Sequence, residues 1–213
     1  MCRGINLLLP FIVCSILING KSFAINEIKL NQAEKELILQ GEIISREVPT
    51  EREKGGTFEA IGLIKAKLNE IYQVLIDFES YNKFMPNVSN VETLHRTDNN
   101  AILNYTLSLP LGKTKKYRVS MNFDISDDTA NLKWRMIPWE GIKESETIAD
   151  TTGYWLVRNF TEKKGYVIIL YHVYTDPGNI PLGLGWIVDI LSKNSVPDVV
   201  VKTRERVHQI HKK

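Results

Sequence analysis

Cysteine is nearly absent from this sequence of 213 residues, and both copies, Cys2 and Cys14, lie within its first 24 residues. This segment has the features of an export signal: a positive charge at Arg3, an apolar run over residues 7–18, and small residues at positions 22 and 24. The apolar run is short for a transmembrane helix. We therefore predict cleavage after Ala24.

Cleavage at this point would leave a chain without any cysteine. Such a chain cannot form a disulfide scaffold, a thiolate metal site or a cysteine nucleophile. We expect an exported protein, either periplasmic or secreted. A retained N-terminal membrane anchor is the alternative interpretation.

Charge of one sign is also lacking. The whole chain carries 27 Lys and Arg residues against 25 Asp and Glu residues, and loss of Arg3 and Lys21 would bring the two numbers level. A nucleic-acid partner is therefore not expected, because it would require a basic excess. One local basic cluster predicts a solvated hairpin end or, alternatively, a weak transient contact with anionic lipid headgroups at a membrane surface; it comprises Lys113, Lys115, Lys116 and Arg118.

The common catalytic and metal motifs are missing as well: the sequence has no His-Glu-x-x-His, no Gly-x-Ser-x-Gly and no P-loop. His208 and His211 have a spacing that can bind a metal, but they lie in a lysine-rich tail and are better interpreted as solvated. His172 lies in an apolar segment, where a hydrogen-bonded structural histidine is favoured over a general base. We expect no metal and no cofactor, and a function without catalysis is favoured.

The sequence that follows the signal begins with two short elements. Residues 31–40 predict a helix that Asn31 caps, and residues 42–47 predict a strand. A charged loop that ends in two glycines follows them. We therefore divide the chain into a signal peptide (1–24), an N-terminal extension (25–56) and a main domain (57–213).

The main domain begins with a strand over residues 58–66 and an amphipathic helix over residues 68–78. Apolar and polar residues then alternate through a series of segments. This period of two predicts an antiparallel sheet with one wet face, and the expected strands span residues 90–95, 101–109, 116–124, 131–137, 147–159 and 165–175.

Beyond Pro181 the apolar period changes to that of a helix, which we expect over residues 187–210 with a bend near Pro197. Its apolar stripe must be buried, most simply on the dry face of the sheet; the stripe comprises Ile187, Ile190, Leu191, Val196, Val199, Val200, Thr203, Val207 and Ile210. A curved sheet that grips a helix in this way can enclose a space.

The order of these elements resembles the START-like, or SRPBCC, superfamily, and most closely its polyketide cyclase and coenzyme Q-binding branch. Three segments within residues 41–213 carry the resemblance: residues 60–88, the Gly-x-Trp-x-Leu-like strand at residues 153–156, and Tyr171 followed by residues 176–181. The resemblance implies an α+β helix-grip fold with a cavity for an apolar ligand such as a lipid, an isoprenoid quinone, a sterol or a polyketide. It does not imply catalysis, since one fold serves many functions.

Large apolar and aromatic residues on the strands are candidates for the wall of this cavity, although close packing in the core is an equal alternative. The ligand-binding candidates are Phe84, Tyr105, Met121, Trp134, Trp155, Tyr171 and Trp186. The apolar stretch 180–186 could gate the cavity, touch a membrane, or be buried under the sheet.

We therefore expect an exported protein that binds a hydrophobic small molecule without catalysis. One alternative is a cyclase or dehydratase that acts on an apolar substrate through His172 or a tyrosine. Another is an interaction module whose core is filled.

Overall fold

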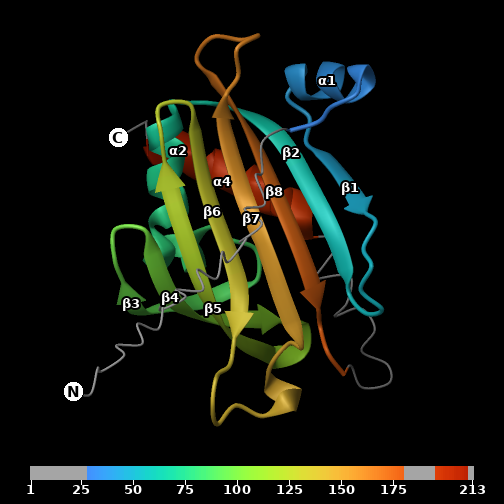
Figure 1. The fold of residues 1–213 in the computed structure, drawn as a ribbon, viewed down its shortest axis with the longest axis vertical. Coiled ribbons are helices and arrows are strands. Elements are labelled where there is room, and N and C mark those ends of the chain that lie inside the picture. The colour runs from blue at the N-terminus through green and yellow to red at the C-terminus, as the bar shows by residue number, and fades with distance from the viewer. Residues whose placement is uncertain (1–27, 180–194, 211–213) are drawn as a thin grey trace, which may run out of the picture.

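Eight antiparallel strands form one strongly curved sheet in the computed structural model, which describes residues 28–179 and 195–210 (Figure 1). The strands lie in the order β1-β2-β8-β7-β6-β5-β4-β3. Their bounds are Ile44–Val48 (β1), Gly56–Lys65 (β2), Val88–Arg96 (β3), Asn100–Leu109 (β4), Lys113–Ile125 (β5), Thr129–Ile137 (β6), Asp150–Asn159 (β7) and Tyr166–Asp176 (β8). Each expected strand is present, and the expected α+β fold is confirmed.

The helices are α1 (Gln32–Leu39), α2 (Leu68–Ile76) and α4 (Ser195–Ile210). Three short 3-10 turns accompany them, namely η1 (Phe78–Lys83), η2 (Pro110–Gly112) and η3 (Glu144–Glu146). Asn31 caps α1 as expected: its side chain accepts a hydrogen bond from the backbone of Glu34, and the Glu34 carboxylate accepts one from the backbone of Asn31. The first part of the expected C-terminal helix, residues 187–194, lies outside the described residues.

The inner, concave face of the sheet is covered by α2 and α4 (Figure 1). The apolar stripe of α4 faces the sheet as expected, and Val196, Val200, Thr203 and Val207 are buried. The prediction is wrong for Ile210, which remains 44% exposed at the end of the helix. Packing of this stripe joins both helices and the sheet into the main core.

The outer face of the sheet carries a second apolar core. Ile38 of α1 and Ile44 of β1 pack there against residues of β2, β7 and β8. β1 pairs with β2 along its whole length and forms one edge of the sheet, whereas α1 packs on the outer face through Ile38. The N-terminal extension is thus integrated into the fold through both packing and strand pairing.

One member of the basic cluster contradicts the expectation of a solvated hairpin end. Lys115 is only 6% exposed, because β5 directs it inward on the same face as Tyr117, and its Nζ donates a 2.6 Å hydrogen bond to the carbonyl of Thr147. Burial lowers the pKa of Lys115, and the nearby carboxylate of Glu144 acts in the opposite direction. Lys113 and Lys116 are exposed, as expected.

Candidate functional site

A cavity of about 120 Å³ lies between the concave face of the sheet and the first turns of α4. Strands β4 to β8 supply its wall with alternate residues, those that the pleat turns inward. On β8 these are Tyr171, Val173 and Thr175, and each is separated from the next by one residue that faces the other way. Residues 85–88 and Ile148 also line the cavity.

Five of the predicted ligand-binding residues lie on this wall, and they are Tyr105, Met121, Trp134, Trp155 and Tyr171. Phe84 lies beside the cavity rather than on its wall: its ring packs edge-on against Tyr81 at 5.5 Å, and the guanidinium of Arg206 lies 5.9 Å from its centre. Trp186 lies outside the described residues. The sequence had not indicated Tyr81 or Tyr117, which also line the cavity; the inward phase of Tyr117 on β5 was the signal that could have found it.

The aromatic side chains of the wall contact one another. Tyr105 and Tyr117 are directly paired across β4 and β5, and their rings stack in parallel with centres 5.1 Å apart. On the other side of the cavity, Tyr171 stacks on Trp134 at 5.7 Å and lies 4.5 Å from Trp155. Such aromatic pairs favour a fixed arrangement of rings, so the wall is a built surface rather than a gap between loosely packed side chains.

Gly153 explains how the ring of Trp134 reaches Tyr171. These two residues, Trp134 and Gly153, are directly paired across β6 and β7. A Cβ atom at position 153 would overlap the Trp134 ring and the backbone oxygen of His172. The glycine of the Gly-x-Trp motif therefore provides the space in which the indole lies against the sheet.

The described lining residues include no charged side chain, and tyrosine is their only titratable type. Burial raises the pKa of Tyr81, Tyr105, Tyr117 and Tyr171 well above the ordinary value of 10. These phenols are therefore neutral at physiological pH. They can donate hydrogen bonds, but they are poor bases for catalysis.

His172 does not belong to this cavity. It follows Tyr171 on β8 and faces the outer side of the sheet, where its Nδ1 lies 2.9 Å from a carboxylate oxygen of Glu59. This contact agrees with the structural interpretation of His172. The alternative in which His172 acts as a base on a substrate in the cavity is contradicted, because the sheet separates the two.

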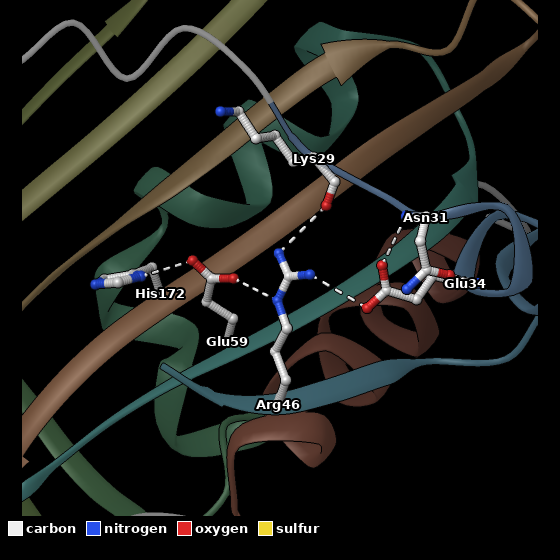
Figure 2. Close-up of polar contacts among 6 residues, drawn as sticks. All are labelled: Lys29, Asn31, Glu34, Arg46, Glu59 and His172. Carbon is white, nitrogen blue, oxygen red and sulfur yellow. Dashed lines mark hydrogen bonds and ion pairs between the residues drawn. The ribbon is translucent and has the colours of Figure 1, made fainter. Parts of the chain in front are cut away.

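His172 is part of a polar network on the outer face, which Figure 2 shows. Glu59 also accepts a 2.8 Å hydrogen bond from Nε of Arg46. The same guanidinium contacts the carboxylate of Glu34 at 3.2 Å and the backbone oxygen of Lys29 at 3.3 Å. The network thus ties the N-terminal segment to β2 and β8 through side chains that are far apart in the sequence.

Two observations bear on other kinds of site. Within residues 28–179 and 195–210, no group of three or more His, Cys, Asp or Glu side chains is arranged to hold a metal ion. Across the same residues, no helix combines the length and the apolar character that crossing a membrane requires.

Known proteins resemble this chain in part of the sequence and in the fold. The family model described as "Polyketide cyclase / dehydrase and lipid transport" matches residues 64–138. No curated protein sequence matches the chain.

Several solved structures share the fold. The STAR-related lipid transfer protein of Xanthomonas axonopodis superposes with a TM-score of 0.67 at 18% identity, over 78% of this chain and 94% of its own. Human StAR-related lipid transfer protein 5 gives 0.67 at 14% identity, over 80% and 84% of the two chains. Human STARD10 gives 0.66 at 16% identity, over 80% and 71%. The resemblance to START-like proteins is confirmed, and the chain has their helix-grip fold.

Proposed function

We propose that this protein binds a hydrophobic small molecule in the cavity between the sheet and α4, and that it carries or sequesters this molecule without transforming it. The observation that carries the proposal is the cavity itself: about 120 Å³ lined mainly by aromatic and aliphatic side chains, with a few uncharged polar ones and no charged side chain among the described lining residues. An apolar engineered cavity of roughly 150 Å³ binds benzene. The volume therefore suits a ring or a section of a chain.

Several features of the cavity support binding rather than catalysis. Burial releases apolar ligand surface from water, which contributes about 0.8 kcal/mol per methylene group, so no charged anchor is required. The buried tyrosines remain protonated, and His172 faces the opposite side of the sheet. The solved structures that share this fold include lipid transfer proteins. The candidate ligands are a lipid, an isoprenoid quinone or a polyketide-like molecule.

Native mass spectrometry of the protein purified from its natural host tests the proposal. We expect a fraction of the protein to carry an additional mass that organic extraction removes, and the extract to contain a hydrophobic compound. Titration of the extracted protein with butylbenzene should then show saturable binding with one site. A protein that carries no extractable compound and binds no butylbenzene has a filled core, which was the alternative of an interaction module.

We further propose that the protein acts outside the cytoplasm after cleavage following Ala24. The support is the sequence of residues 1–24, with its positive start, apolar run and small residues before the cleavage point. N-terminal sequencing of protein from the natural host should begin at Ile25. An intact Met1 on protein recovered from the cytoplasm would contradict export, and an intact Met1 on membrane-bound protein would indicate a retained anchor.

A further inference from the structure

Three phenol hydroxyls of the cavity wall lack a protein partner. The hydroxyl of Tyr81 donates a 2.5 Å hydrogen bond to the backbone oxygen of Leu75. In contrast, Tyr105, Tyr117 and Tyr171 make no hydrogen bond to any residue that the structure describes, although all three line the cavity. An enclosed hydroxyl without a partner would be costly, so the surroundings of these three groups matter.

The unpartnered hydroxyls border the open volume rather than packed protein. Among the described residues, no enclosed side-chain nitrogen or oxygen is left without a hydrogen bond. The three hydroxyls have no such bond, so each must face space that a small molecule can reach. Tyr105 and Tyr117 lie on the neighbouring strands β4 and β5, whereas Tyr171 lies on β8, which β6 and β7 separate from β5 in the curved sheet.

The rings of Tyr105 and Tyr117 stack with centres 5.1 Å apart, and Tyr171 lines the same cavity. Burial is the main cause of the raised pKa of Tyr105, and Tyr81, Tyr117 and Tyr171 each raise it further by repulsion of the charged form. The phenols therefore stay protonated, and each keeps a proton to donate.

The polar side chains of the described wall can all donate a hydrogen bond: besides the tyrosines and tryptophans, they are Asn87, Thr151, Thr175 and Ser195. The indole N–H groups of Trp134 and Trp155, which can only donate, likewise have no partner among the described residues. Without a cation on the described wall, a buried carboxylate or phosphate would lack compensation for its lost hydration. The complementary group is one that is neutral and accepts hydrogen bonds without needing to donate one.

We propose that the natural ligand is an uncharged hydrophobic molecule with a carbonyl group, whose oxygen accepts hydrogen bonds from the hydroxyls of Tyr105, Tyr117 and Tyr171. This inference rests on the proposed function, since it names the ligand class of the same cavity. A carbonyl oxygen has two lone pairs, so two of the three hydroxyls engage it at a time. The rings of the wall hold the apolar remainder of the ligand.

Matched ligands and matched variants test this assignment. Butylbenzene, the ketone butyrophenone and the corresponding benzylic alcohol share one carbon skeleton, and calorimetry gives the affinity of each for the full chain. Because the ketone is better hydrated than the hydrocarbon, the informative quantity is the change that each variant causes for each ligand. The variants are Tyr105→Phe, Tyr117→Phe and Tyr171→Phe. We expect two of them to weaken ketone binding by about three- to tenfold each, and all three to leave hydrocarbon binding unchanged.

Control variants separate this effect from general damage to the cavity. Tyr154→Phe removes a hydroxyl on the outer face, where the Tyr154 ring stacks on His172, and should leave all three affinities unchanged. We expect the alcohol to lose less affinity than the ketone in the cavity variants, because its own O–H finds few acceptors. For a ketone labelled with ¹³C, the carbonyl resonance should shift downfield on binding to the parent and return toward its value in hydrocarbon solvent in the triple phenylalanine variant.

Distinct outcomes would overturn the two proposals. If ketone and hydrocarbon affinities change together, or if neither changes in any variant, the hydroxyls do not recognise the ligand, although the cavity still binds apolar molecules. If the alcohol loses as much affinity as the ketone or more, the carbonyl assignment is wrong. If the parent protein binds none of the three compounds, the proposed binding function fails together with this inference.

Discussion

The two faces of the sheet differ in chemistry, although the residues that form them are adjacent along the strands. On the outer face, Arg46, Glu59, His172 and Tyr154 form one row of directly paired residues across β1, β2, β8 and β7. The adjacent inner row runs through Ala60, Tyr171 and Trp155 on three of the same strands. A shift of one residue along the chain therefore exchanges a charged, hydrogen-bonded row for an aromatic cavity wall.

The difference between the rows lies in whether their polar atoms have partners. In the outer row, Glu59 is bonded on both sides, and the ring of Tyr154 stacks on His172 at 4.6 Å. In the inner row, Tyr171 contacts two tryptophans through its ring and leaves its hydroxyl to the cavity. The polar side chains of the outer row thus bond to one another, whereas the Tyr171 hydroxyl of the inner row has no protein partner, as the proposed ligand site requires. Substitutions on the two faces should accordingly give different responses.

The largest effect is expected where α4 closes the inner face. Val200 is completely buried in the main core. Val200→Asp would place a carboxylate there without a partner, which costs several kcal/mol or forces protonation. We expect loss of the folded protein, measured as loss of the circular dichroism signal and of a cooperative unfolding transition.

The matched control lies on the same helix. Lys202 is exposed and forms an ion pair with Glu205 of its own helix. Lys202→Ala should change the free energy of unfolding by less than about 0.5 kcal/mol. A folded Val200→Asp variant combined with a strongly destabilised Lys202→Ala variant would mean that α4 presents the opposite face to the sheet.

The helical phase of α4 was predictable because its period is local. The same holds for β5, where strict alternation assigns Tyr117, Val119 and Met121 to one face, and for the cap at Asn31. A local period, however, does not reveal which strands become neighbours. Glu59 and His172 are 113 residues apart, so their contact depends on register, and no pattern in either segment encodes it.

The second core was missed for a related reason. Alternation predicts one wet face for an antiparallel sheet, but β2 and β8 are buried on both faces. The apolar character of β8 indicated that something covers it; the sequence did not show that α1 is the cover. Lys115 was predicted to be solvated because the segment around it is rich in basic residues, which is typical of a hairpin end. Its phase on β5, however, directs it inward.

The next largest effect should separate the two faces directly. Ile38 is completely buried in the outer core, and truncation of such a residue costs about 2–5 kcal/mol. Ile38→Ala should therefore lower the free energy of unfolding in urea by that amount and leave butylbenzene affinity unchanged. Trp134→Ala and Tyr171→Ala should do the reverse: each should cost clearly less than the roughly 3–5 kcal/mol of a packed aromatic and weaken butylbenzene binding.

The proposed difference between the faces would be wrong if all three variants changed stability and butylbenzene affinity in the same way. Loss of stability without a separate binding defect in the Trp134 and Tyr171 variants would mean that these side chains are close-packed core. A binding defect in Ile38→Ala of the same size would mean that the outer cover and the cavity are coupled through the sheet.

A smaller effect is expected at Gly153, which lies next to both the Trp134 ring and the backbone of His172. The Cβ of Gly153→Ala would overlap the Trp134 ring on the inner side and the backbone of His172. Overpacking of this kind costs about 1–3 kcal/mol, and displacement of the indole should also weaken butylbenzene binding. Gly165→Ala is an unsuitable control because of its positive φ, so Ala149→Gly, at a neighbouring loop position, serves as the comparison. An unchanged butylbenzene affinity in Gly153→Ala would show that the position of the Trp134 ring does not shape the site.

The smallest effect, and the one most specific to the outer face, is the dependence of stability on acid. Burial alone would raise the pKa of Glu59, but hydrogen bonds from His172 and Arg46 outweigh it, so the pKa lies below the usual value of 4.5. An ionised carboxylate only accepts hydrogen bonds, so Nδ1 of His172 donates to it. Because folding lowers this pKa, the contribution is complete above the unfolded value near 4.5 and disappears as pH falls through the folded value.

Glu59→Gln should therefore destabilise the protein at neutral pH by about 1.5 kcal/mol, at the lower end for hydrogen bonds to a charged group, because Arg46 is a third exposed and water screens it. The difference in melting temperature between parent and variant should shrink as pH falls below about 4.5, where the Glu59 of the parent also becomes neutral. Butylbenzene affinity should stay the same, since the carboxylate faces away from the cavity. A difference in melting temperature that stays constant with pH would show that Glu59 stabilises the sheet by its shape alone. The charge of the outer row would then contribute nothing to stability.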